Sequence, residues 1–298
     1  MCGIRKGFQL VVGRDCRGLR ERGRVSFLQS PVGRNAHRTN KRADLCLIAS
    51  SPVPRPLRGV VGPAFSHTLR ELLTPLEIAR LGLLWWTLPF NLRGRGEPVL
   101  LLPGLGGGES SMFVIRAYLR ALGYAVFDWG LGRNDGKVQE KLPQVITALL
   151  ERYEETGVPV ALIGWSLGGY LAREAARDHP YAVSRVITMG SPLVGGPKYT
   201  ATAGFFRRQG VSHDALEARV AARYHVPLQV PVTSLYSKTD GVVAWQASID
   251  HWSPLAENVE VDTTHFGFGF SREALSLVAE RLAGVAGPQR PATEHGEI

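Results

Sequence analysis

The chain has 298 residues, of which 44% are apolar and 20% charged, and its mean hydropathy is −0.03. This composition supports a sizeable buried core and excludes collagen-like, coiled-coil and wholly disordered chains. The net charge of +9 arises in residues 1–60, which carry 13 Lys and Arg against 3 Asp and Glu, whereas the rest of the chain carries 22 against 23. The body of the protein is therefore electrically balanced, and we expect it to bind no nucleic acid.

Residues 1–60 show no sustained helical or strand periodicity, and we predict a basic, disordered N-terminal segment. A basic arm that touches nucleic acid or anionic lipid is one alternative, and a prefix read ahead of the native start is another. All three cysteines, Cys2, Cys16 and Cys46, lie in this segment, so neither a disulfide framework nor a cysteine metal site is expected in the core. This cysteine usage fits the cytoplasmic protein that we expect, although a disulfide-free exported enzyme would look the same.

Residues 61–94 form an apolar segment in which leucines recur at three- and four-residue spacing. This spacing predicts helices that pack on the core, with a break at Thr74-Pro75. Peripheral lipid contact through residues 66–90, or a cover over an active site, is the alternative. The longest uncharged apolar run, residues 81–92, is too short to span a bilayer, so we predict no transmembrane helix. The recurring residues are Leu69, Leu72, Leu73, Leu76, Leu81 and Leu84.

Residues 95–286 alternate short apolar runs with helix-like stretches. Apolar runs of this kind indicate strands that are buried on both faces. We therefore predict an α/β domain with a doubly wound, mostly parallel sheet, helices on both faces, and a site beyond the carboxyl ends of the strands. We interpret residues 195–227 as a small helical insertion or cap over the site, and residues 287–298 as a C-terminal tail. The predicted strands are 99–102, 124–129, 160–164, 183–190, 232–237 and 258–261, and the predicted helices are 112–123, 138–155, 167–178 and 272–284.

The stretch GWSLGG places Ser166 between a predicted strand and a predicted helix. A G-x-S-x-G match alone carries little information, but this strand-to-helix setting is the one that a nucleophile elbow requires. Such a tight turn brings neighbouring segments close together, so Gly164 and Gly168 must lack side chains. The turn would expose the Ser166 hydroxyl at the start of a helix, and we interpret Ser166 as a nucleophile.

A serine hydroxyl needs a base to take its proton, and His265 is the histidine best placed for this role. It follows the last predicted strand and precedes the last predicted helix, whose N-cap we assign to Ser271. Asp240 follows the strand 232–237 and would orient the imidazole, which completes the order Ser, Asp, His along the chain. A structural histidine and an exposed turn aspartate are the alternatives, and Asp262 is the spare acid candidate.

Two backbone N–H groups are needed to bind the oxyanion of an acyl-transfer intermediate. We assign one to Leu167, directly after the nucleophile, and the other to Leu105 in the glycine-rich loop LLPGLGGG. This loop lacks the G-K-[ST] ending and the acidic ribose partner of nucleotide-binding loops, so nucleotide binding is not expected.

Taken together, these motifs resemble the α/β-hydrolase family over residues 97–284, in family order. The likeness is greatest to the bacterial lipase/esterase-like branch, in which the strand after the elbow ends in a GSP or GTP sequence, here residues 190–192. One departure is Pro103, which stands where many lipase relatives have a histidine that often braces the oxyanion loop. The matching stretches are PVLLLPGLGGG, GYAVFDWGLGRNDG, LIGWSLGGYLARE, VITMGSPLVGG, YSKTDGVVAW and THFGFG.

The resemblance implies hydrolysis of a carboxylic ester or related acyl bond through a covalent acyl-serine, with no metal or organic cofactor. It makes Ser166 the nucleophile, Asp240 the orienting acid and His265 the base. The sequence therefore predicts a serine hydrolase that acts on a small-molecule ester with a hydrophobic acyl group. An acyltransferase with the same triad and a non-catalytic binding module on the same fold are the alternatives.

Three aromatic residues flank the candidate triad along the chain, namely Trp165, Trp245 and Phe266. They would line an apolar acyl pocket, or else pack in the core as aromatic side chains commonly do. The sequence indicates no oligomeric state.

Overall fold

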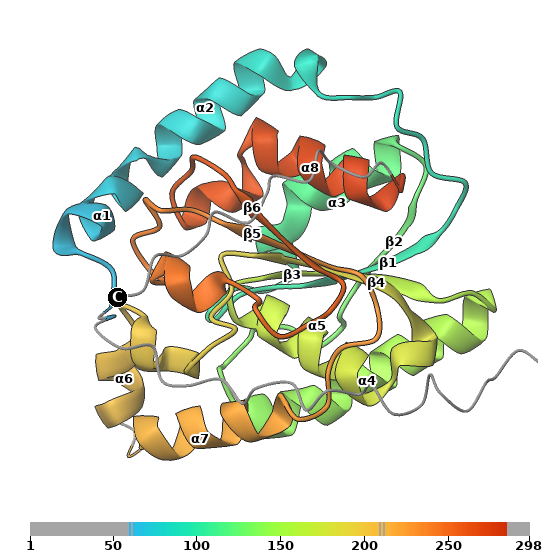
Figure 1. The fold of residues 1–298 in the computed structure, drawn as a ribbon. Helices are drawn as coiled ribbons and strands as arrows, with labels where there is room; N and C mark the ends of the chain where they lie inside the picture. The colour runs from blue at the N-terminus through green and yellow to red at the C-terminus, as the bar shows by residue number, and fades with distance from the viewer. Residues whose placement is uncertain (1–59, 61, 209, 211, 285–298) are drawn as a thin grey trace, which may run out of the picture. The chain divides into compact units, whose positions relative to one another are not determined.

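The computed structural model describes residues 60, 62–208, 210 and 212–284, all of which belong to one unit of the chain, Ile48–Ile298. Our predictions for residues 1–59, the three cysteines included, and for the tail 287–298 lie outside the described residues. Six strands form one parallel sheet in the order β2-β1-β3-β4-β5-β6 (Figure 1). They are β1 (Pro98–Leu102), β2 (Ala125–Asp128), β3 (Val160–Trp165), β4 (Val183–Met189), β5 (Val232–Tyr236) and β6 (Ala256–Glu260).

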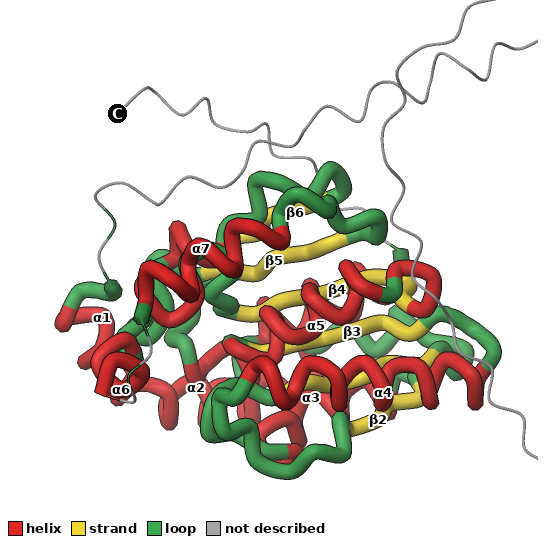
Figure 2. The backbone as a smooth tube through the Cα atoms, turned by 90° about the horizontal axis from the view of Figure 1, so that it is seen from below, coloured by secondary structure: helices red, strands yellow, loops and turns green. Residues whose placement is uncertain are grey.

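Helices cover both faces of this sheet, and Figure 2, seen from below, shows α5 lying across β3 and β4. The predicted doubly wound α/β fold is therefore confirmed. The helices are α1 (Phe65–Arg70), α2 (Thr74–Leu84), α3 (Phe113–Ala121), α4 (Val138–Thr156), α5 (Leu167–Asp178), α6 (Ala203–Arg208), α7 (His213–Arg223) and α8 (Arg272–Leu282).

Alternate side chains of the central strands enter two separate apolar cores. Val99 and Leu101 of β1 pack with residues of α3 and α8 on one face. Leu100 and Leu102 pack with residues of α4 and α5 on the other face. Because both faces of the strand are buried, its sequence is uniformly apolar rather than alternating. Figure 1 shows α3 and α8 on one side of the sheet and α4 and α5 on the other.

Two helix ends follow from local chemistry. The Ser271 hydroxyl accepts a hydrogen bond from the Ala274 N–H at 3.3 Å and caps α8, as predicted. The helix α4 ends at Gly157, whose φ of 71° is the left-handed conformation that glycine adopts at least cost.

The segment predicted to pack on the core as helices is buried only in its second half. Leu81 and Leu88 belong to the core, and the ring of Trp85 lies 5.9 Å from that of Tyr118 in an edge-on contact. The first half leaves its leucines exposed, so the expectation of core packing is wrong there. The reason is that its inward positions carry polar side chains. The exposed leucines are Leu69, Leu72, Leu73 and Leu76.

None of the described helices combines the length and the apolar character needed to cross a bilayer.

The stretch interpreted as an insertion contains a short 3-10 helix, Gly196–Tyr199, followed by α6 and α7. It contacts the loop that carries the candidate acid. The Ala201 N–H donates to the Val242 carbonyl at 2.8 Å, and the Ala244 N–H donates to the Tyr199 carbonyl at 3.0 Å. The insertion and the chain just after Asp240 therefore hold each other in place.

A buried ion pair joins α5 to the loop before β6. The Arg173 Nη2 atom lies 2.8 Å from Asp250 Oδ2, and both side chains are fully buried. Burial alone raises the pKa of the Asp250 carboxyl, but the Arg173 charge and hydrogen bonds from Ser253 and Trp252 outweigh it and hold that pKa below its usual range. This carboxylate is therefore ionised in the folded protein at neutral pH.

Replacing Asp250 by Asn leaves the buried Arg173 charge poorly compensated, since the next carboxylate, on Glu174, lies 3.8 Å from Arg173 Nη1. We expect the free energy of unfolding to fall by about 3 kcal/mol near neutral pH, measured by urea denaturation. Because the pKa of Asp250 is lowered in the folded protein, its contribution to the free energy of unfolding is fully present above the ordinary carboxyl pKa. That contribution is lost as pH falls through the lowered pKa. The exposed Glu154→Gln is the control, and an equal, small effect of both changes would contradict the assignment.

Candidate active site

Ser166 lies in the sharp turn between β3 and α5. Its φ of 54° and ψ of −122° make it the only non-glycine residue with positive φ in the part of the chain that the structure describes. Two hydrogen bonds hold this strained backbone, from Ser166 N–H to the Met189 carbonyl at 2.8 Å and from Gly169 N–H to the Ser166 carbonyl at 3.0 Å. Strain of this kind persists only where the surroundings impose it, and it is the geometry of a nucleophile elbow.

Glycines around this turn allow backbone segments to touch. A Cβ atom on Gly164 would lie 2.4 Å from backbone atoms of Gly168, and one on Gly168 would lie 2.1 Å from the Leu102 carbonyl oxygen. The prediction that both residues must lack side chains is confirmed. Gly169 is a third such position, which sequence reasoning missed, because a Cβ there would lie 2.0 Å from Ser191 Oγ.

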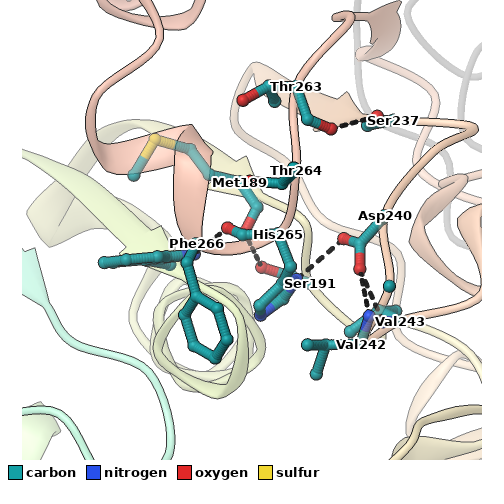
Figure 3. A network of polar contacts seen from close by, with 12 residues as sticks. Met189, Ser191, Ser237, Asp240, Val242, Val243, Thr263, Thr264, His265 and Phe266 are labelled. Atoms are coloured by element: carbon teal, nitrogen blue, oxygen red, sulfur yellow. Dashed lines mark hydrogen bonds and ion pairs between the residues drawn. The ribbon is translucent and has the colours of Figure 1, made fainter. Parts of the chain in front are cut away.

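The predicted acid and base form a direct hydrogen bond (Figure 3). The His265 Nδ1 atom lies 2.7 Å from Asp240 Oδ2, and both side chains are almost completely buried. The other carboxylate oxygen accepts the N–H groups of Val242 at 2.8 Å and Val243 at 2.7 Å. Because an ionised carboxylate can only accept, Nδ1 must carry the imidazole proton, and the lone pair lies on Nε2. That is the tautomer that a general base requires.

The loops that carry the pair are joined to each other, and the pair packs against the residue that follows β4. The Ser237 hydroxyl donates to the Thr263 carbonyl at 2.6 Å. Gly190, from the GSP sequence, has a φ of 54°. A Cβ on it would lie 2.9 Å from Asp240 Oδ2 and 3.1 Å from His265 Nδ1. Only a glycine leaves room for the pair at this point.

His265 also contacts the residue that precedes the serine. The Trp165 indole N–H donates to the His265 carbonyl at 3.1 Å, and the two ring centroids are 6.4 Å apart. Ser166, Asp240 and His265 follow β3, β5 and β6, whose carboxyl ends lie at one edge of the parallel sheet. The structure thus gathers the three elements that carry the predicted triad.

The glycine-rich loop after β1 lies against the serine, since a Cβ on Gly104 would be 3.1 Å from Ser166 Cβ. Within the described ranges, the backbone N–H groups of Leu105 and Leu167 donate to no protein acceptor. One directly follows the serine and the other lies in the loop that packs against it, so both remain candidates for an oxyanion hole.

Asn134 braces this loop, and sequence reasoning missed it. Its side-chain Nδ2 donates to the Pro103 carbonyl at 2.9 Å. Its backbone carbonyl accepts the Gly106 N–H at 2.7 Å, and its own N–H donates to the Gly107 carbonyl at 2.8 Å. The side chain is completely buried, which marks a structural amide rather than a loop residue exposed to water. Asn134 thereby braces the loop by hydrogen bonds, which the side chain of Pro103 cannot form.

The three aromatic residues predicted to flank the triad have different surroundings. Trp165 is buried in the apolar core, the alternative to a pocket role. Trp245 stacks on Tyr236 with ring centroids 5.8 Å apart, and it lines a cavity of about 250 Å³ beside Asp240. Phe266 is half exposed, and its ring meets that of His265 edge-on at 5.7 Å. Phe266 is therefore the one among them that borders both the imidazole and the surface.

The spare acid candidate lies outside this arrangement, whereas two glutamates contact it. The spare acid candidate Asp262 is 84% exposed and lies 3.9 Å from Arg70, away from the imidazole. Two glutamates that sequence reasoning did not single out, Glu71 and Glu77, contact the histidine loop. The described residues contain no group of three or more His, Cys, Asp or Glu side chains that could hold a metal ion.

Comparison with known proteins agrees with this fold. The profile of the alpha/beta hydrolase family matches residues 99–286. The chain belongs to this family. Among solved structures, the mature Bacillus licheniformis lipase BlEst2 is similar over 63% of this chain and 92% of its own, at 17% identity and a TM-score of 0.51. At 17% identity, this similarity shows a common fold and nothing further.

Two curated relatives are similar over shorter stretches. The bovine mitochondrial palmitoyl-protein thioesterase ABHD10 is 22% identical over 191 residues, which cover 53% of this chain and 62% of the bovine protein. The polyketide synthase ThaQ of Burkholderia thailandensis is 30% identical over 142 residues, which cover 45% of this chain and 6% of the synthase. The match therefore spans less than two thirds of either relative.

The elbow glycines allow a matched pair of stability tests. Gly168→Ala places a methyl group into the Leu102 carbonyl, so we expect a loss of about 3 kcal/mol of unfolding free energy in urea. Gly204→Ala in α6 meets no atom within 4 Å and should be neutral or stabilising by about 0.5 kcal/mol. Equal stability of the two variants would show that the turn is not held as tightly as described.

Proposed function

We propose that this protein is a serine hydrolase of the lipase/esterase-like branch, which cleaves a carboxylic ester with a hydrophobic acyl group. The observation that carries the proposal is the buried hydrogen bond between His265 and Asp240, beside a serine held in an elbow conformation. A buried imidazole whose proton is fixed on Nδ1 by a carboxylate is suited to act as a base through Nε2. The fold alone would not support this, because the same fold hosts many functions.

In the proposed reaction, His265 Nε2 takes the hydroxyl proton of Ser166 while Oγ forms a bond to the ester carbonyl carbon. The carbonyl oxygen becomes an oxyanion, which accepts hydrogen bonds from the N–H groups of Leu105 and Leu167. The intermediate collapses, the bond to the alcohol oxygen breaks, and the imidazolium returns its proton to the leaving alcohol. Water then attacks the acyl-serine by the same sequence and releases the carboxylic acid.

The apolar surroundings of the site support a hydrophobic acyl group. Phe266 borders the imidazole and is half exposed. The side chains of Leu105, in the loop that packs against the serine, and of Phe206 in α6 both lie within about 3.5 Å of the space that a side chain on Gly136 would fill. The insertion thus places an aromatic ring beside the loop that is proposed to bind the oxyanion. An acyl chain bound there would replace water on these surfaces.

A thioester is the second candidate bond, and it is favoured by the similarity to a protein named as a palmitoyl-protein thioesterase. The same residues would act, with a thiolate as the leaving group. Acyl transfer to an alcohol instead of water is a further variant. Matched palmitoyl esters and thioesters separate the first two reactions, and product analysis with competing alcohols separates the third.

Ser166→Ala tests the proposal directly. It removes the nucleophilic oxygen, so turnover of p-nitrophenyl acyl esters should fall by about 10⁴-fold or more, while the melting temperature stays within a few degrees. A graded series of acyl lengths, measured on the unaltered protein, should show kcat/KM rising with chain length.

The matched control is Ser212→Ala, which removes a helix N-cap of the insertion and leaves the elbow unchanged. Activity of Ser166→Ala close to that of the unaltered protein would rule out the acyl-serine. If a fluorophosphonate left the unaltered protein unlabelled, the reading as a non-catalytic binding module would replace the proposed function.

A further inference from the structure

The segment α1–α2 is an inverted amphipathic element. Its inward positions are polar and recur every three residues. Each of these side chains forms a hydrogen bond with a loop that carries the candidate acid or the candidate base. Its outward positions are large and apolar. The inward residues are Thr68, Glu71, Thr74 and Glu77. This is the reverse of a helix that packs on a core, whose apolar stripe turns inward.

Glu71 makes contacts with both loops that carry the candidate acid and base. Its Oε1 atom accepts the N–H of Gly241 at 2.9 Å and the N–H of His265 at 2.8 Å. Its Oε2 atom accepts the N–H of Phe266 at 3.0 Å. Gly241 directly follows Asp240, so one carboxylate holds the backbone at both ends of the Asp240–His265 hydrogen bond.

Neighbouring contacts make this bridge rigid. The Thr68 hydroxyl donates to the Gly241 carbonyl at 2.9 Å, and a Cβ on Gly241 would lie 2.3 Å from the His67 carbonyl oxygen. Glu77 accepts the Thr264 N–H at 3.0 Å. A residue that fixes two loops relative to each other controls the distance and angle of the hydrogen bond between them.

We propose that Glu71 is a positioning residue for the Asp240–His265 pair, an inference that rests on the proposed function. Glu71 touches no reacting atom in the proposed reaction. It accepts three backbone N–H groups, which a neutral side chain cannot match. Without it, the His265 backbone loses its anchor to the Asp240 loop, and Nε2 moves away from the serine hydroxyl.

The test compares Glu71→Ala and Glu71→Gln with Glu273→Gln, an exposed carboxylate of α8. We expect kcat for a p-nitrophenyl ester to fall about 100-fold in Glu71→Ala and about 10-fold in Glu71→Gln, with KM within about twofold. Glu273→Gln should match the unaltered protein. Melting temperatures show which variants fold, and Glu71→Gln, which keeps one acceptor oxygen, serves if Glu71→Ala does not fold.

A role through His265 also predicts non-additivity. In a His265→Ala background, adding Glu71→Gln should change the slow residual rate of fluorophosphonate labelling by less than about twofold. A normal kcat in a folded Glu71 variant would overturn the positioning role. So would an equal loss of labelling rate on adding Glu71→Gln to the unaltered protein and to His265→Ala. If the unaltered protein neither turns over esters nor is labelled, the proposed function fails, and this inference falls with it.

The outward face of the same segment carries a second, independent observation. It exposes large apolar side chains that no described residue covers, while the two carboxylates in residues 65–87 are both engaged inward. Arg80 is exposed on the segment, and so is Arg70, which lies 3.9 Å from the carboxylate of Asp262. The face is therefore apolar, and Arg80 gives it a positive charge that neither carboxylate of the segment offsets. Its exposed apolar residues are Phe65 (76%), Leu72 (76%), Leu76 (66%), Leu83 (68%) and Trp86 (71%).

We infer that this face docks on an anionic lipid surface. Apolar side chains with flanking arginines are the composition of helices that lie in the interfacial layer of a membrane. Charge argues against two other occupants, a second copy of the chain and the chain's own residues 1–60. A second copy would bring a face of the same charge against this one. Residues 1–60 carry 13 Lys and Arg against 3 Asp and Glu, so they too would be repelled.

The test is sedimentation of the full chain with vesicles of phosphatidylglycerol and phosphatidylcholine in equal parts, and with phosphatidylcholine alone. Leu72→Gln combined with Leu76→Gln should lower binding to the anionic vesicles about tenfold or more, while Val158→Gln, an exposed apolar residue elsewhere, should not. Residues 1–60 are the same in all variants, so their own attraction to the vesicles cancels. Equal binding of all three proteins, or a dimer that the Leu72 and Leu76 changes dissociate, would overturn the lipid assignment.

Discussion

The hydrogen bond between the Asp240 carboxylate and the His265 imidazole is the interaction on which the rest of the site depends. Three separate parts of the chain are shaped around it. Gly190 leaves room for both side chains. The N–H groups of Val242 and Val243 donate to the second carboxylate oxygen. Glu71 anchors the backbone beside each partner. Buried charge is costly unless every acceptor is satisfied, so this arrangement is both a stability requirement and a constraint on the imidazole.

Much of this architecture could be predicted from the sequence because it has local causes. Buried parallel strands must be apolar on both faces, so the central strands β1 and β3 were recognisable as short runs without alternation, whereas the edge strand β6 carries polar residues. The elbow could be predicted because its close backbone contacts exclude side chains at Gly164 and Gly168. Asp240 and His265 were identifiable because parallel strands end at one edge, so residues that follow them meet there.

The parts that could not be predicted depend on contacts between distant segments. Glu71 bonds to residues 170 and more positions away along the chain, and nothing around it distinguishes it from a surface glutamate. The leucine spacing predicted an amphipathic segment, but a second stripe of polar residues has a similar spacing, and only the fold decides which stripe turns inward. Asn134 stands in a polar loop sequence whose bracing role becomes visible only beside Pro103.

The central claim is that an elbow serine, two backbone donors and the anchored imidazole act on one acyl group. A crystal structure of the protein after reaction with a fluorophosphonate tests it most directly. The account predicts a covalent bond from phosphorus to Ser166 Oγ, with the phosphonyl oxygen accepting hydrogen bonds from the Leu105 and Leu167 N–H groups and with His265 Nε2 facing Oγ. Phosphorus bonded to a different residue, or an imidazole turned away from Ser166, would contradict it.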